Sequence, residues 1–375
     1  MRCETTSSRA PCGGSGTWGS TACAWTPYTP SSTARSAPSW PSSQRPSKGQ
    51  AAALGRQIHL FAESDRNSLA YLRSRELGGC GIDAQWCDDF HHALHALLTG
   101  ERAGYYRDFG ELEQLADAFR AGFVYTGQYS SYRRRRHGVP SDGVPPRRFV
   151  ACAQNHDQVG NRQQGERLAS LVSMPQLRLA AGAVLLSPFL PLLFMGEEHG
   201  ERAPFLYFVD HRDPELREAV RRGRREELAA FAWRGETPDP AAEETFIRSR
   251  PASRPSPGSR EERLRDWYRE LLRLRRELPA LGAAGPGESA VTADAARRWI
   301  ALHHRRDGDE AVVALSFADA GIELPWRWAG AWRLRLDSAD PEWGGAGGDL
   351  PSQASEGVTL TLPPWTVAVY ERVRP

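Results

Sequence analysis

Residues 148–168 of this chain read RFVACAQNHDQVGNRQQGERL, and this stretch decides how the rest of the sequence is interpreted. Residues 149–153 are apolar and partly β-branched, which is typical of a strand buried in a sheet. The strand ends in four polar residues, Gln154, Asn155, His156 and Asp157. Barrel enzymes place their chemistry at such strand ends, although an ordinary Asx turn is the alternative interpretation.

The polar residues after this strand form a recognisable motif. Asn155, His156 and Asp157 supply an amide, an imidazole and a carboxylate, and Gly160 with Asn161 permits a tight turn. The run NHDQVGNR resembles the fourth signature region of the α-amylase family (glycoside hydrolase family 13). Its continuation to residue 168 is similar to that of malto-oligosyltrehalose trehalohydrolases.

The bulk properties are those of an ordinary globular protein. The 375 residues are 40% hydrophobic and 25% charged, and their net charge of +2 gives no reason to expect a nucleic-acid or membrane partner. Six irregularly spaced cysteines form no CxxC pair, so we expect reduced thiols and a cytoplasmic location. The sequence shows neither an apolar stretch long enough to span a bilayer nor a signal peptide, and its oligomeric state stays open.

Strand-like and helix-like segments alternate through the middle of the chain. Helices are expected from residue 88 and over residues 111–121 and 177–186. Strands are expected over residues 58–62, 81–86, 149–153 and 190–195, and polar tips end them at Glu63, Gln85–Trp86, His156–Asp157 and Glu197–Glu198. This alternation predicts a parallel α/β sheet with one active edge.

The pattern changes in the last third of the chain. Two amphipathic helices are expected over residues 213–230 and 261–278, and the Pro/Ser/Arg-rich stretch 238–260 is expected to be a mobile loop. Beyond Gly285, short strands with Gly, Asp and Pro turns predict a β-sandwich. The expected strands are 299–303, 311–315, 332–336, 358–362 and 362–370.

Residues 1–50 differ from the remainder because they contain no Leu, Ile, Val, Phe or Asp. Such a segment buries too little apolar surface to offset its ordering entropy, so we expect it to be disordered. A reading frame shifted by one base gives a second interpretation. Trp25 has a single codon, so the shifted triplet at Thr26 is GAC, which encodes Asp. Across residues 21–29 the shift permits Asp-Gly-Leu-Arg-Leu-Asp-Ala-Val-His, which resembles the second α-amylase signature with its nucleophilic aspartate.

The resemblance implies a division of the chain into three parts. Residues 1–50 would be an out-of-frame segment, residues 51–285 the C-terminal half of a TIM-type (β/α)8 barrel, and residues 286–375 a small antiparallel β-sandwich domain. The first half of the barrel, which carries the nucleophile in the family, would be missing. We therefore expect the strand near Ile58 to lie at an unpaired edge, which is a common route to aggregation.

Glycoside hydrolysis needs two carboxyl groups beside the scissile bond. The run AESD, residues 62–65, resembles the third α-amylase signature, which implies that Glu63 is the general acid/base. The resemblance also implies that Asp157 holds sugar hydroxyls and favours the transition state. The candidate substrate-binding residues are Gln154, Asn155, His156, Asp65, Gln85, Trp86, Asp88, His91, Glu197 and Arg162. Taken alone, Glu63 would favour interpretation as a helix-capping or salt-bridged carboxylate, and the downstream motif NHDQVGNR reverses that preference.

Several neighbouring patterns have more than one interpretation. The histidines that follow Asp88 mimic metal-ligand spacing, but successive helical residues face different directions, which favours sugar binding or packing. Trp86, Phe205 and Tyr207 are interpretable as sugar platforms or as core. The basic run at residues 133–137 is typical of a solvated turn, and a phosphate or nucleic-acid site is the alternative.

The implied activity is hydrolysis of the α-1,4 bond next to the trehalose end of maltooligosyltrehalose, with retention of configuration and no cofactor or metal. Because no in-frame residue matches the nucleophile, we expect this chain to be inactive. Two alternatives are a non-catalytic carbohydrate-binding remnant and another α-amylase-family enzyme such as a glycogen-branching enzyme. Trehalose release, or branch formation on amylose, separates these hypotheses.

Overall fold

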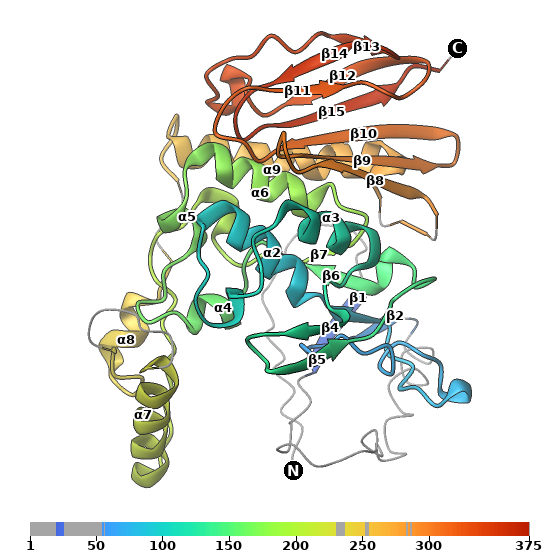
Figure 1. Ribbon diagram of the computed structural model, residues 1–375. Helices are drawn as coiled ribbons and strands as arrows, with labels where there is room; N and C mark the ends of the chain where they lie inside the picture. The colour runs from blue at the N-terminus through green and yellow to red at the C-terminus, as the bar shows by residue number, and fades with distance from the viewer. Residues whose placement is uncertain are drawn as a thin grey trace.

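A computed structural model describes residues 20–25, 55, 57–229, 237–251, 255–282, 284–285 and 287–374. Its centre is a five-stranded parallel sheet, in the order β1-β2-β3-β6-β7 (Figure 1). The strands are β1 (Ser20–Trp25), β2 (Gln57–Ala62), β3 (Ala84–Trp86), β6 (Phe149–Ala151) and β7 (Leu190–Pro191). The predicted parallel sheet is confirmed.

One prediction about this sheet is wrong. The strand near Ile58 is not at an unpaired edge, because β1 runs parallel to it from the Ser20–Gln57 pair to the Trp25–Ala62 pair. The prediction that residues 1–50 are disordered falls mostly outside the described residues. Within that segment the structure describes only β1, so the remainder of the prediction is not tested.

Helices cover the sheet on the side of the C-terminal domain (Figure 1). The main ones are α2 (Asp88–Thr99), α3 (Leu112–Ala121), α6 (Met174–Leu185) and α9 (Arg260–Glu277). Leu94, Leu97 and Leu98 of α2 are buried, and they join a large core that also includes α3, α6 and α9. Because Gly182 lacks a side chain, α6 approaches β15 closely: a Cβ there would lie 2.7 Å from Val367 Cγ2.

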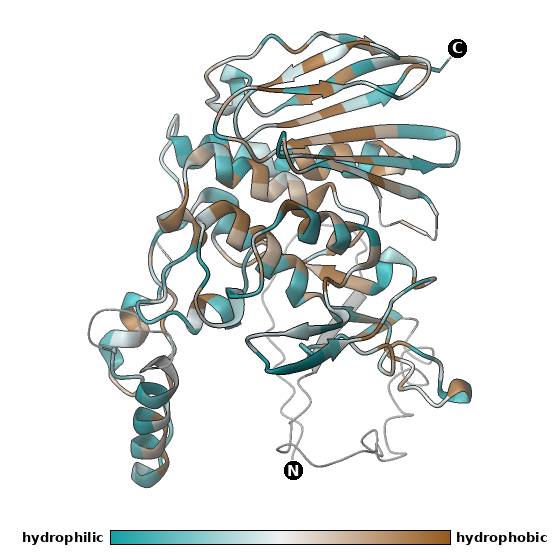
Figure 2. Ribbon diagram, in the orientation of Figure 1, coloured by the Kyte–Doolittle hydropathy of each residue, from teal (hydrophilic) through white to brown (hydrophobic). Residues whose placement is uncertain are grey.

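The remaining elements of this part of the chain are α4 (His156–Gly160), α5 (Leu168–Leu171), α7 (Pro214–Ala229), α8 (Glu243–Arg248) and the hairpin of β4 (Thr126–Ser130) and β5 (Arg135–Gly138). The expected loop at 238–260 therefore contains a helix, α8. In Figure 2, α7 projects from the body and is coloured mostly hydrophilic.

The C-terminal region consists of two antiparallel sheets. The larger has the order β13-β12-β15-β10-β9-β8, and the smaller pairs β11 with β14. Their bounds are β8 Ser289–Asp294, β9 Trp299–Arg306, β10 Asp309–Ser316, β11 Ile322–Pro325, β12 Ala331–Asp337, β13 Gln353–Ser355, β14 Thr359–Leu362 and β15 Val367–Arg372.

Alternation along these strands explains how the larger sheet is covered on both faces. Trp299 and Ala301 of β9 belong to the core between the two sheets, whereas Ile300 and Leu302 belong to the core shared with the helices. Successive side chains of a strand point to opposite faces, so one strand supplies both layers. The predicted antiparallel sheets are confirmed, and the domain boundary at residue 285 stays a prediction.

Candidate active site

Two predicted polar tips, Glu63 and His156–Asp157, and the predicted helix start at Asp88 lie at one edge of the parallel sheet. Glu63 directly follows β2, Asp88 begins α2 one residue after Cys87 and β3, and the α4 helix begins at His156 soon after β6. Because β2, β3 and β6 are parallel neighbours, their C-terminal ends meet at the same edge. The sheet therefore brings these side chains together.

The electrostatics of Asp88 show how close the carboxylates are. Burial, followed by repulsion from Asp65, Asp157, Asp89 and Glu63, raises the pKa of Asp88 to about 7. Repulsion of this kind requires short separations, because the energy of two charges falls with distance and with solvent screening. The predicted acid/base residue and its partner Asp157 therefore belong to one acidic cluster around Asp88.

Asp157 is exposed at the start of α4 and is held by its neighbours. Asn155 caps the helix, since its Oδ1 accepts from the backbone N–H groups of Asp157 (2.8 Å) and Gln158 (3.2 Å). Asn161 Nδ2 donates to Asp157 Oδ1 over 2.8 Å. His156 is also exposed, and its ring lies edge-on to Trp86 with centroids 6.0 Å apart. Both side chains are open to a ligand.

Asp65 is tied to the β4–β5 hairpin. Arg133, in the turn of the hairpin, lies 2.8 Å from Asp65 Oδ2, and the His137 ring nitrogen Nε2 lies 2.8 Å from the Asp65 carbonyl oxygen. Burial alone would raise the pKa of Asp65, but Arg133 and His137 outweigh it and the pKa is lowered. The basic run at 133–137 is thus more than a solvated turn, because Arg133 holds the loop that follows Glu63.

Two predicted substrate-binding residues have their polar atoms engaged inside the protein. His91 is 1% exposed, and its ring nitrogens lie 2.9 Å from the Ala153 carbonyl and 3.0 Å from the Tyr106 hydroxyl. Arg162 is buried and donates twice to Glu101, over 2.7 and 2.9 Å. These contacts are all internal to the protein, and the roles of both residues in substrate binding stay predictions.

Three further predicted contacts are also buried. Gln85 is 1% exposed, and Gln154 accepts from the Leu168 N–H over 3.0 Å. Glu197 is buried, and Tyr268 donates to it over 3.4 Å. Their burial is what the structure shows, and their roles in substrate binding stay predictions.

Asp89 is a structural residue that the sequence interpretation missed. Its Oδ2 accepts from Asn67 Nδ2 over 2.7 Å and from the N–H groups of Val124 and Tyr125 over 2.8 Å each. It thereby joins the loop after Glu63, the start of α2 and the entry to the hairpin. A second acidic residue beside Asp88 was the only available signal.

Burial raises the pKa of Glu197 to about 8, against hydrogen bonds from Phe194, Tyr268 and Gln154. The folded chain therefore holds this proton more tightly than the unfolded chain, and stability should fall as pH rises from about 4.3 to about 8. Glu197→Gln should flatten this fall and raise the free energy of unfolding at pH 8 by about 1–3 kcal/mol. Urea unfolding at pH 5 and pH 8 measures the change.

The neighbouring Glu198→Gln is the matched control for this measurement, because the Glu198 side chain is 40% exposed. It should leave the pH dependence in place. An unchanged pH dependence in Glu197→Gln would contradict the assignment of the titration to Glu197.

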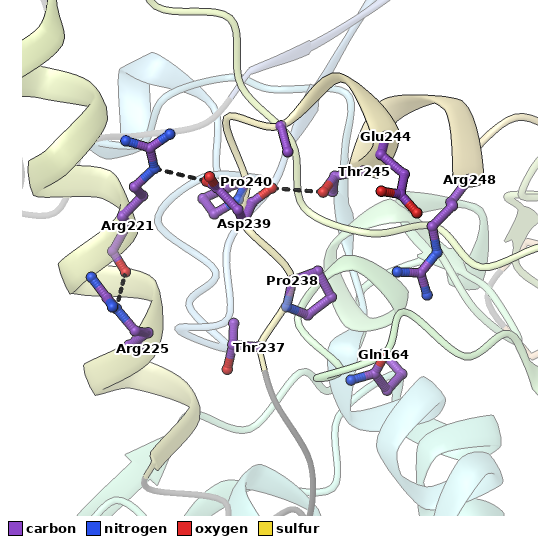
Figure 3. A pocket seen from close by; sticks show the side chains of 11 residues that line it. Gln164, Arg221, Arg225, Thr237, Pro238, Asp239, Pro240, Glu244, Thr245 and Arg248 are labelled. Carbon is purple, nitrogen blue, oxygen red and sulfur yellow. Dashed lines mark hydrogen bonds and ion pairs between the residues drawn. The ribbon is translucent and has the colours of Figure 1, made fainter.

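A cavity of about 610 Å³ lies between α7 and the segment leading to α8 (Figure 3). Its lining includes Arg221, Arg225, Asp239, Thr245 and Arg248, and none of the predicted site residues. The candidate active site thus rests on the carboxylates at the sheet edge. Among the described residues, no group of three or more His, Cys, Asp or Glu side chains is arranged to hold a metal ion. No described helix is both long and apolar enough to cross a membrane.

Comparisons with known proteins show which proteins this chain resembles. The chain is 41% identical over 318 residues to the malto-oligosyltrehalose trehalohydrolase of Rhizobium sp. (strain M-11), covering 84% of this chain and 50% of that one. It is 48% identical over 251 residues to the protein of the same name from Arthrobacter ramosus, covering 65% of this chain and 42% of that one. The chain thus spans about half the length of the curated relatives it matches.

A solved structure agrees with these relatives. An α-amylase-like protein from Salmonella typhimurium superposes with a TM-score of 0.70 at 34% identity, over 85% of this chain and 52% of that one. No family model matches the chain. The α-amylase-like fold is confirmed.

Proposed function

We propose that this relative of the malto-oligosyltrehalose trehalohydrolases derives from a retaining glycoside hydrolase that releases trehalose from maltooligosyltrehalose. The observation that carries the proposal is the convergence of Glu63, Asp88 and Asp157 at one edge of the parallel sheet. A hydrolase of this kind needs carboxyl groups on both sides of the scissile bond. No cofactor is required.

In the proposed reaction a carboxylate attacks the anomeric carbon while Glu63 donates a proton to the departing glycosidic oxygen. Water then attacks the glycosyl-enzyme bond, and Glu63 takes up the proton of that water. Asp157 binds sugar hydroxyls in both steps, and His156 donates a hydrogen bond beside it. The exposure of Asp157 and His156 supports these roles.

The nucleophile of that reaction has no in-frame counterpart beside β2. The sequence contains no Asp or Glu between Glu4 and Glu63, and the residue after β1 is Thr26. We therefore propose that the chain as written is nearly inactive. The absence of this carboxylate is also consistent with the alternative of a non-catalytic carbohydrate-binding remnant. A glycogen-branching enzyme is a further alternative.

Product analysis tests the proposal. A full-length, frame-restored version should release trehalose from maltooligosyltrehalose and form no branch points on amylose. Branch formation without trehalose release would favour the branching enzyme. If neither product forms but maltooligosaccharides bind, the remnant is favoured. We also keep the cytoplasmic location as a proposal, based on the free cysteines Cys80, Cys87 and Cys152.

A further inference from the structure

Arg224 is unusual on its helix because it is buried. The α7 helix is mostly hydrophilic (Figure 2), yet Arg224 is only 7% exposed. Its guanidinium lies over the Tyr207 ring, 5.2 Å from the ring centroid, and donates to the Gly160 carbonyl and, over 2.9 Å, to Asn161 Oδ1. A surface helix thus directs one charged side chain onto the end of α4.

The Asn161 amide connects Arg224 to the candidate active site. Its oxygen accepts from Arg224, and its nitrogen donates to Asp157 Oδ1 over 2.8 Å. Arg has only donors and an ionised carboxylate has only acceptors, so each partner selects the same orientation of the amide. With the amide reversed, its oxygen would face a carboxylate and its nitrogen a guanidinium, and both hydrogen bonds would be lost.

We propose that Arg224 is a positioning residue that acts through Asn161 to hold the Asp157 carboxylate in the orientation that binds sugar. The role in sugar binding rests on the proposed function, whereas the link between the three side chains does not. Arg224 also ties the Gly160 carbonyl, so it fixes the end of the five-residue α4 helix as well as the amide.

The link is measurable in the chain itself by NMR of the Asn161 side-chain NH₂ group. In the parent background these signals should shift when the carboxylate is removed by Asp157→Asn, because Asp157 Oδ1 accepts from the amide, and this shift is the response that the other variants test. Arg224→Met should abolish that response because the amide is no longer oriented. Arg224→Lys, the milder variant, should reduce it, because one ammonium group does not reproduce the fork of a guanidinium. Asn161→Ala identifies the signals.

Arg221→Met is the matched control. Arg221 lies on the same helix, three residues earlier, but it points to Asp239 over 2.8 Å at the cavity and not to α4 (Figure 3). It should leave the Asn161 response intact. If the response survives in both Arg224 variants, or disappears in Arg221→Met as well, the proposed link is overturned.

Sugar binding tests the functional part of the inference. Titration calorimetry with maltotetraose should show affinity about tenfold weaker in Arg224→Met, and Asn161→Ala should add little to that loss, since both changes break one chain of contacts. Arg221→Met and Asn161→Ala should be additive. Additive losses for Arg224 and Asn161 would overturn the positioning role.

The two failures are distinguishable. If the parent chain binds no maltotetraose while the NMR response follows Arg224, the proposed function fails and the link stands. If the parent chain binds maltotetraose but the Asn161 response is unchanged in the Arg224 variants, the link from Arg224 to Asp157 fails and the proposed function stands.

Discussion

On maltooligosyltrehalose, the chain as written is expected to release trehalose at least about a thousandfold more slowly than a full-length, frame-restored version. A retaining mechanism forms a covalent bond to a carboxylate. The sequence offers none between Glu4 and Glu63, although Glu63 itself is intact. Losing one member of a cooperating catalytic set removes most of the rate, whatever the others do.

The pairing of β1 supports the shifted reading. Trp25 at the end of β1 pairs with Ala62, the residue before Glu63, so β1 ends level with the catalytic strand. In the shifted frame the residue after that position is Asp. Restoring the frame should recover Asp-Gly-Leu-Arg-Leu-Asp at the codons for residues 21–26, and resequencing checks this directly.

Two outcomes would contradict this prediction. Comparable turnover by the two versions would show that the nucleophile has been misplaced. A stop codon in the shifted frame close to the Trp25 codon would exclude the frameshift, and the low activity would then need another cause.

The sequence predicts the parallel sheet well because its strands are short apolar runs with polar ends, a pattern that depends on local residues. It fails where pairing depends on distant segments. Residues 20–25 lie in a segment without Leu, Ile, Val or Phe, so the in-frame sequence does not mark them as the parallel neighbour of β2. The α8 helix was missed because Pro and Ser on both sides of it indicate a loop.

For the candidate site, the strand-end rule indicates Glu63 and Asp157 but does not show which neighbouring side chains have partners inside the protein. His91 and Arg162 lie close in sequence to other candidate residues, and each has such partners. Those partners are distant in sequence: Arg162 binds Glu101, 61 residues away, and Asn161 binds Arg224, 63 residues away. Motif membership indicates a region, and only the fold shows which way a side chain points.

In the frame-restored enzyme, Glu63→Gln is expected to lower kcat by at least about a thousandfold, and Asp157→Asn by about a hundredfold or more. In the proposed mechanism Glu63 supplies the proton that the leaving oxygen needs, and an amide does not supply it. Asp157 is proposed to stabilise charge at the sugar through contacts that strengthen in the transition state, and an amide there is neutral.

The nature of the leaving group separates the two roles. In a maltooligosyl fluoride the leaving group is a fluoride ion, which departs without protonation. Glu63→Gln should therefore form the glycosyl-enzyme intermediate much faster on that substrate than on maltooligosyltrehalose. Asp157→Asn should stay slow on both substrates. Asp117→Asn is the control, because Asp117 pairs with Arg120 on the exposed face of α3, and it should be neutral. If Glu63→Gln is equally slow on the fluoride, Glu63 is not the proton donor. Asp88 would then be the next candidate, because its pKa of about 7 would let it carry a proton at neutral pH.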